Sequence, residues 1–346
     1  PAAAPAAPAA VASTVELKMA PSEVGLPQEA PGDAADVLAR FYFEAEKAKV
    51  TKVRELRQKP DEAAGLATAE IEIEAAGSLA QYSLGGTLSL LPESDPKDVE
   101  AAVRLMGLSA ADLDKWITFA PPAGSAPGTR IKKPFPTPCK LGEALSRYCD
   151  LARAPTKKML SAMLPKLSDQ GAKARIEKLL ADADALKVLQ DHKLCCRMHE
   201  FWAMVGVHAI SPGDFLTLCP RQKAREFTIA SSPKAAPQRI TLCVSLSSHE
   251  LPDMESACRP LAEAGIFDAD ALRACAGRGR FFGTCSRWLT CRLKAGDMVL
   301  ARQRPSPLHL PEKDVPVVMV GAGAGVAPFR GFWEELRRGP QTAPAS

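Results

Sequence analysis

Apolar and charged residues alternate strictly in one short stretch of the chain, from Ala69 to Ala75. A period of two is typical of a β-strand with one buried face and one wet face. Residues 47–56 mix β-branched and charged side chains, and the segment from Tyr82 to Leu91 places a Gly-Gly bend before a further apolar stretch. These patterns predict strands across residues 45–91.

The pattern becomes helical from Asp95 to about Val205. Asp95 is a candidate helix cap and Pro96 suits the first turn. Val99 and Val103 then recur at helical spacing, and clusters of glycine and proline separate later segments of the same style. We therefore expect an all-α insertion, with further helices at residues 141–151, 157–167, 172–190 and 199–204.

Strand patterns return between residues 211 and 304. We expect strands at residues 214–219, 226–230, 239–245, 291–293 and 297–302. Short antiparallel strands on both sides of a helical block predict one β-barrel interrupted by an insertion. Beyond it, an apolar strand at 315–320, a glycine turn and a helix at 328–338 are typical of the opening of a parallel α/β domain.

The chain opens with an Ala/Pro tract that runs to about Pro31. Irregularly spaced prolines block a helix there, so residues 1–44 are expected to form a linker or tail. We find no signal peptide, and no apolar run approaches the ~18 residues of a membrane span.

Composition narrows the function classes. With 46% hydrophobic and 24% charged residues, the 346-residue chain is typical of a soluble globular protein. A net charge of +4 is too small to indicate nucleic acid as a partner. The ten cysteines form no C-x-x-C pair, and the Cys195-Cys196 pair with His199 lacks a second ligand pair, so we expect a reducing compartment and no metal site.

The segment from Arg225 to Ser232 is the first candidate for cofactor chemistry. Arg225 and Phe227 lie on one face of the predicted strand, so a guanidinium can hold a phosphate while a ring covers a flavin. Thr228 offers a hydroxyl beside that ring. A plain amphipathic strand with a surface arginine is the alternative interpretation.

Two glycine-rich helix starts are the other candidates. Gly283 to Ser286 opens a helix whose N–H groups can hold an anion, although an ordinary capped helix has the same pattern. Gly321, Gly323 and Gly325 follow an apolar strand and precede a helix, which is typical of a phosphate-binding turn.

In this order the three motifs resemble the ferredoxin–NADP reductase superfamily, and most closely its diflavin branch of NADPH–hemoprotein reductases. The resemblance covers roughly residues 45–340. Residues 87–95, 133–138 and 225–232 follow the order of that branch, and the helical insertion matches its connecting domain. The expected fold is an antiparallel, ferredoxin-reductase-like FAD-binding barrel with an all-α connecting insertion, plus the start of an α/β NADP-binding domain.

The resemblance implies five regions. Residues 1–44 form the linker, 45–92 and 206–310 the two parts of the FAD barrel, 93–205 the connecting domain, and 311–346 a truncated NADPH-binding domain. An FMN domain is expected only in the missing N-terminal part of the intact chain.

The resemblance also implies roles for individual residues. Arg225 would contact the FAD phosphates, Phe227 would stack on the flavin, and Thr228 would lie near N5 as the catalytic hydroxyl. Further FAD contacts would come from Cys243, Val244 and Ser245 through their backbone and from Gly283, Thr284, Cys285 and Ser286 around the pyrophosphate. NADPH would meet Gly321, Gly323, Gly325 and Arg54, with the site incomplete.

The sequence departs from that family pattern at four positions. Phe227 stands where tyrosine is usual, so FAD would bind less tightly. Thr228 replaces the usual serine and Ala324 the common threonine, and Gly86 replaces an aspartate.

The implied function is NADPH-dependent electron transfer through FAD, and FMN in the intact protein, to a haem protein acceptor. The expected location is the cytoplasm or the cytoplasmic face of the endoplasmic reticulum. We expect this chain alone not to complete the cycle. A sulfite-reductase-type flavoprotein and a flavin-free binding or assembly module are the alternatives.

Overall fold

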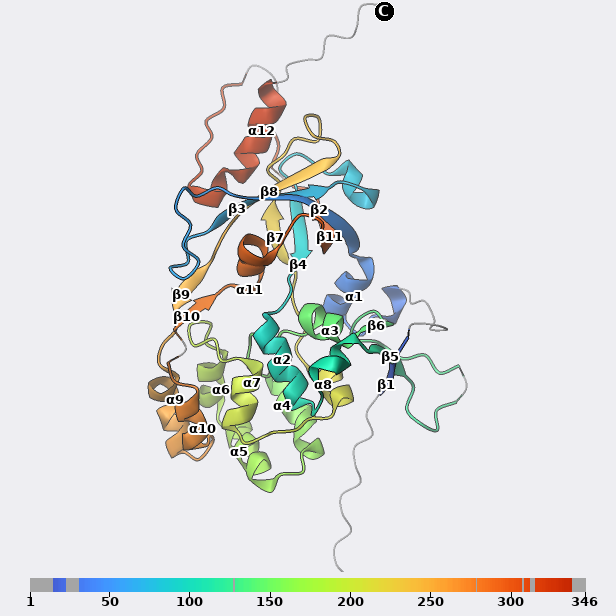
Figure 1. Cartoon of the computed structure of the whole chain (residues 1–346), viewed down its shortest axis with the longest axis vertical. Helices are drawn as coiled ribbons and strands as arrows, with labels where there is room; N and C mark the ends of the chain where they lie inside the picture. Colours follow the sequence, from blue (N-terminus) through green and yellow to red (C-terminus); the bar gives the residue numbers. More distant parts are fainter. Residues whose placement is uncertain are drawn as a thin grey trace, which may run out of the picture. The chain divides into compact units, whose positions relative to one another are not determined.

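The computed structural model describes residues 15–22, 31–126, 128–277, 279–306, 308–311 and 315–337. The chain divides into two compact units, each built from segments that lie far apart in the sequence (Figure 1). The first unit takes residues 1–43, 94–222 and 251–279, and the second takes 44–93, 223–250 and 280–346.

A six-stranded antiparallel sheet forms the centre of the second unit, in the order β7-β4-β11-β2-β3-β8. The strands are β2 (Glu46–Glu55), β3 (Thr68–Glu74), β4 (Thr87–Leu91), β7 (Arg225–Thr228), β8 (Arg239–Ser245) and β11 (Met298–Arg304). β7 and β8 are the two edges, and the ladder between them is not closed. The antiparallel sheet is thus confirmed, and the closed barrel is not.

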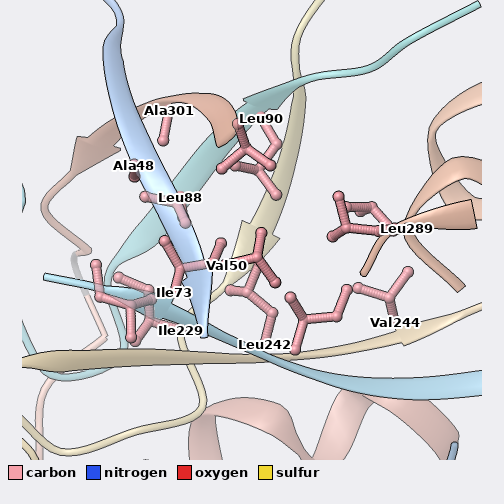
Figure 2. Close-up of a cluster of buried hydrophobic side chains, with 14 of the residues drawn as sticks. Ala48, Val50, Ile73, Leu88, Leu90, Ile229, Leu242, Val244, Leu289 and Ala301 are labelled. Carbon is pink, nitrogen blue, oxygen red and sulfur yellow. The ribbon is translucent and has the colours of Figure 1, made fainter. Parts of the chain in front are cut away.

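One face of this sheet carries the apolar core of the second unit. Ile73 of β3, Leu88 of β4 and Leu242 of β8 are fully buried and belong to the same cluster as Leu289, which follows helix α11 (Thr284–Arg287) (Figure 2). Residues 288–292 continue α11 as a helical turn, η6 (Trp288–Arg292). The strand predicted at 291–293 is therefore wrong, because Cys285, Trp288 and Leu289 reach the core at the i, i+3, i+4 spacing of a helix.

The last part of the second unit contains helix α12 (Ala327–Arg337), which follows a 3₁₀ turn, η7 (Gly323–Val326). The helix was predicted, but residues 315–320 do not form the predicted strand. Val318 and Val320 are 87% and 84% exposed. Without burial of these side chains, the β propensity of the valines does not fix a strand. A two-stranded ribbon, β9 (Ser248–Glu250) with β10 (Arg280–Phe282), and a 3₁₀ turn, η2 (Gly77–Gln81), complete the unit.

The first unit is mostly helical among its described residues. Its helices are α1 (Val37–Glu44, whose last residue belongs to the second unit), α2 (Pro96–Leu105), α3 (Leu141–Glu143), α4 (Lys157–Met163), α5 (Gln170–Ala181), α6 (Ala183–Gln190), α7 (Met198–Met204), α8 (Pro212–Leu218), α9 (Met254–Glu263) and α10 (Ala269–Ala274), with shorter turns at η1 (Pro31–Asp33), η3 (Ala110–Asp114), η4 (Ala144–Tyr148) and η5 (Leu164–Lys166). The predicted start of α2 is confirmed, since Asp95 accepts a hydrogen bond from the Lys97 N–H and Pro96 occupies the first turn. None of the helices in the described part of the chain is long and apolar enough to cross a membrane.

Three expectations for the first unit are wrong. Residues 214–218 lie in helix α8, which Cys219 follows, so the strand predicted at 214–219 is wrong. Ser211 caps the Asp214 N–H and Pro212 fits the first turn of this helix. A three-stranded sheet of β1 (Glu16–Ala20), β5 (Trp116–Ala120) and β6 (Cys139–Lys140) shows that the unit is not all-α.

The third wrong expectation concerns the linker, because residues 16–20 and 37–44 form β1 and α1. In α1 the buried Tyr42 packs on Tyr148, with ring centroids 4.9 Å apart, and donates a hydrogen bond to the Gln222 carbonyl. The rest of the Ala/Pro tract, residues 1–14 and 23–30, lies outside the described residues.

Candidate functional site

The strand β7 presents Arg225 and Phe227 at the edge of the sheet. They lie opposite Leu90 and Leu88 of β4, so the two side chains share one face, as predicted. Both are half-buried, and the Phe227 ring packs against the core of the second unit. Thr228, opposite Thr87, is also half-buried. The ring is therefore held in place by the core while part of it stays open to a ligand.

The start of helix α11 lies against the end of β8. The Gly283 N–H donates to the Ser247 carbonyl (2.8 Å), and the Ser286 hydroxyl accepts from the Ser247 N–H (3.1 Å) and donates to the Gly283 carbonyl (3.1 Å). A Cβ atom on Gly283 would lie only 2.8 Å from that hydroxyl oxygen. Glycine is thus needed for this close approach, and the Ser286 hydroxyl is engaged within the turn.

The first two sequence motifs lie close together, because Phe227 packs against the core cluster to which Cys285 belongs and the Arg225 charge acts on the Cys285 thiol. Burial raises the pKa of Cys285 to about 12, and the positive charge of Arg225 opposes that rise. The first N–H groups of a helix have no acceptor within it and carry the positive end of its dipole. A cationic guanidinium beside such a helix start is a donor set for an anion such as a phosphate.

The edge strand β8 brings a second kind of donor to the same region. The Thr241 carbonyl accepts from the Ala230 N–H (2.7 Å) and the Thr241 N–H donates to the Ser231 hydroxyl (3.0 Å), so Thr241 points its backbone groups away from β3. Because these directions alternate along a strand, Cys243 and Ser245 also point theirs outward. Val244 lies between these positions, so its backbone groups point toward β3 and not to the open edge, and its side chain is buried in the core (Figure 2).

A charged cluster occupies the face of the sheet opposite the core. The Arg54 Nε and Nη2 atoms lie 3.1 and 2.9 Å from Glu70 Oε1, and the Arg330 Nη1 atom of α12 lies 3.1 Å from Glu70 Oε2. Cys243 is the cross-strand neighbour of Glu70. Burial raises the pKa of the Cys243 thiol, the Arg330 charge lowers it and the Glu70 charge raises it. Arg54 therefore does not stand alone, but is bound to a nearly buried carboxylate.

The glycine-rich turn reaches this region through helix α12. A Cβ on Gly321 would lie 2.8 Å from the Gly325 carbonyl oxygen, and Gly323 has a φ of 54°. Glu334 accepts a hydrogen bond from the Ser232 N–H (3.2 Å), and Glu335 binds the Ser232 hydroxyl. The helix behind the third motif is thus anchored to the residues that follow β7.

The structure explains the glycine at position 86. A Cβ there would lie 2.7 Å from the Ser83 hydroxyl and 2.9 Å from the Ser83 carbonyl oxygen. The Gly86 carbonyl also accepts the Ile229 N–H (2.8 Å). A side chain at position 86 would clash with Ser83, so this turn requires glycine. The same turn accepts a hydrogen bond from the residue that follows β7.

Sequence reasoning missed three residues of this region. Ser247 holds the α11 turn, Arg330 bridges α12 to the sheet, and Glu70 binds two arginines. Of these three residues, only Glu70 belongs to a pattern that the sequence shows. It is one of the charged residues of the alternating strand, and that pattern predicted a solvent-exposed face. Its 7% exposure shows that this face is partly covered.

Comparison with known proteins gives a family match that spans parts of both units. Residues 43–258 match the family described as FAD binding domain. The chain is 27% identical over 291 residues to a bifunctional cytochrome P450/NADPH–P450 reductase of Fusarium oxysporum, covering 81% of this chain and 24% of that protein. It is 26% identical over 274 residues to the NADPH–cytochrome P450 reductase of Homo sapiens, covering 77% of this chain and 36% of that protein. The chain thus spans only 24–36% of the length of these relatives.

Proposed function

The chain belongs to the FAD binding domain family, and from this premise we propose that its second unit holds FAD and accepts electrons from NADPH. In the whole protein these electrons would pass on to a haem protein, since the relatives are named as NADPH-dependent reductases of cytochrome P450. The resemblance to the diflavin branch adds FMN as the carrier between FAD and that acceptor. The proposal makes the chain the FAD-binding part of a diflavin oxidoreductase.

One observation carries this proposal: the convergence of Arg225, the first turn of α11 and the outward-facing edge of β8. A guanidinium and helix N–H groups suit a pyrophosphate, and outward backbone groups suit the polar edge of a flavin ring. Gly283 leaves the space that a Cβ would fill. The residues present therefore fit the group that the family name implies.

Each residue has a role that its position allows. Arg225 and the N–H groups of Thr284, Cys285 and Ser286 would hold the FAD phosphates, and the partly exposed ring of Phe227 would support the isoalloxazine. The Thr228 hydroxyl would orient a proton donor or acceptor near N5, and the backbone of Cys243 and Ser245 would bind the ring edge. When bound, FAD supplies the exchange between a hydride and single electrons.

The NADPH side is proposed on separate residues. Gly321, Gly323 and Gly325 would let the backbone approach the nucleotide, and Arg54 would contact its phosphates. Ala324 offers no hydroxyl to that ligand.

The test is a visible absorption spectrum of the purified chain after FAD is added and unbound FAD is washed away. We expect a retained flavin band, and Arg225→Ala should weaken FAD binding by about 10- to 100-fold, the range for one hydrogen bond to a charged group. Arg304→Ala is the matched control, because Arg304 is an exposed arginine of the same sheet, paired with Glu226. A wild-type chain that retains no flavin would refute the proposal and favour the flavin-free binding module.

The acceptor is tested separately once flavin binding is established. Reduction of a cytochrome P450 by the chain joined to an FMN domain supports the diflavin proposal. Reduction of a sulfite reductase haem subunit instead would favour the sulfite-reductase-type alternative.

A further inference from the structure

One nearly buried carboxylate binds two arginines that come from distant parts of the chain. Glu70 lies in the middle of β3, and its side chain is only 9% exposed. Its Oε1 atom takes the Nε and Nη2 atoms of Arg54 from β2, and its Oε2 atom takes Nη1 of Arg330 from α12. The proposed function gives no role to this carboxylate.

The geometry of the Arg54 pair fixes the orientation of the guanidinium. Both atoms on its Nε–Nη2 side are directed to a single carboxylate oxygen, so the plane of the guanidinium cannot rotate without breaking both bonds. The Nη1 side lies outside this pair, and the Arg54 side chain is 55% exposed. An arginine held along one edge is preorganised to present its other edge to an oxyanion.

We propose that Glu70 is a positioning residue, which holds Arg54 so that its outer edge faces the phosphates of a dinucleotide. The same carboxylate ties Arg54 to the helix that follows the glycine-rich turn, through Arg330. The strand β2, through Arg54, and the helix α12, through Arg330, thus both bind Glu70. This inference rests on the proposed function, because it assigns the phosphate of NADPH or a similar dinucleotide to the exposed side of Arg54.

Electrostatic repulsion alone and the positioning role predict opposite effects of removing Glu70 on anion binding, so the direction of the effect tests the proposal. A carboxylate near a bound phosphate repels it, so removal of the negative charge should tighten anion binding if charge alone matters. If Glu70 orients Arg54, its removal should weaken binding although the site becomes more positive. The sign of the change separates the two explanations.

The chain offers a matched control two residues away. Glu72 lies on the same face of β3, its side chain is 12% exposed, and its oxygens lie 3.5 Å from Lys52 Nζ and 3.6 Å from Arg239 Nη1. It carries the same charge and has basic neighbours, but it does not contact Arg54 through any hydrogen bond or ion pair that the structure describes. Glu72→Ala therefore reports the effect of charge alone.

The experiment measures the Kd of inorganic pyrophosphate by titration calorimetry at low ionic strength, using the whole chain. We expect Arg54→Ala to weaken binding by about tenfold, the lower end of the range for one hydrogen bond to a charged group. Glu70→Ala should weaken it by about three- to tenfold, because Arg54 is still present but no longer held in place. Glu70→Gln should lie between Glu70→Ala and wild type, because its amide oxygen still accepts from Arg54. Glu72→Ala should leave the Kd unchanged or lower it slightly.

A double variant checks that Glu70 acts through Arg54. Arg54→Ala with Glu70→Ala should bind pyrophosphate as Arg54→Ala does, because the positioned group is already absent. Tighter binding by Glu70→Ala, or an equal further loss in the Arg54→Ala background, would overturn the proposal.

Folding and flavin binding are followed on the same samples. An unchanged thermal midpoint for Glu70→Gln, which keeps the shape of the side chain, shows that a weaker Kd is not due to unfolding. If the wild type retains FAD but does not bind pyrophosphate, the inference fails and the proposed function stands. If flavin is absent while the ranking of the variants holds, the proposed function fails and the role of Glu70 in orienting Arg54 stands.

Discussion

Two helices of the second unit start after a glycine-rich segment, and the surroundings of these two helix starts differ. Behind the start at Gly283, Cys285, Trp288 and Leu289 are at most 5% exposed and belong to the core. Before the start of α12, Val318 and Val320 are more than 80% exposed. The glycine pattern therefore sets the backbone in both places, but the two starts are supported differently. The start at Gly283 belongs to the core, whereas the segment that leads into α12 is exposed and α12 itself is held by residues at and after its start, Ala327 and Phe332, both 3% exposed.

The largest effect is expected from removing that core. Leu289→Ala deletes a fully buried side chain and should lower the free energy of unfolding by about 2–5 kcal/mol, measured by urea denaturation. Val318→Ala removes a similar apolar group from the exposed segment and should change stability by less than about 0.5 kcal/mol. Equal losses for the two variants would contradict the comparison, because they would show that the valines are buried in solution.

The docking of α12 is tested next. Phe332 is 3% exposed, and its ring lies 3.3 Å from where a Cβ on Gly85 would sit. Phe332→Ala should release residues 327–337 while the sheet stays folded, so the free energy of global unfolding should fall by only about 1–2 kcal/mol, less than a fully buried core site loses. Amide hydrogen exchange should become fast in α12 and stay slow in β3. Fast exchange in both elements would show that the helix supports the sheet.

The strands that were predicted correctly share one property. The alternation in β3 and the apolar positions of β8 continue into one buried face, so local pattern and tertiary packing agree. The segment 315–320 has the same apolar signal but no buried face, and residues 214–219 have a polar cap and a proline that favour a helix. The hydrophobic pattern therefore predicted strands correctly where the apolar residues pack into a core. It failed where helix capping or solvent exposure determined the local structure instead.

The candidate site could be predicted in part. The order of motifs led to Arg225, Phe227 and Gly283, because a glycine, an aromatic ring and an arginine have characteristic local patterns. Ser247 could not be found, since its role depends on hydrogen bonds with a turn that lies almost forty residues later in the sequence. The covering of Glu70 by a distant helix likewise leaves no trace in a local pattern.

The burial of the helix that starts at Gly283 can be measured through the titration of the Cys285 thiol. Burial raises the pKa of Cys285 from 9.0 to about 12. The folded state therefore keeps the proton that the unfolded chain releases, so the stabilisation is complete below pH 9 and is lost as pH rises from 9 to 12. We expect Cys285 to account for a loss of about 1.4 kcal/mol between pH 8 and pH 10. Urea denaturation of Cys285→Ala at both pH values should show a loss smaller by this amount, and an unchanged loss would mean that the thiol is accessible to water.

The smallest effect is expected at the two glycines themselves, and it separates the two helix starts most directly. Gly283→Ala places a Cβ 2.8 Å from the Ser286 hydroxyl oxygen, which two hydrogen bonds hold in place. A shift of this turn by a few tenths of an ångström should cost about 1 kcal/mol and weaken FAD binding about fivefold, measured by flavin fluorescence titration. Gly325→Ala is the control, because no atom lies within 4 Å of its added Cβ and its backbone is not left-handed. If Gly325→Ala weakens FAD binding as much as Gly283→Ala, the exposed turn takes part in the flavin site and the contrast between the two helix starts does not hold for binding.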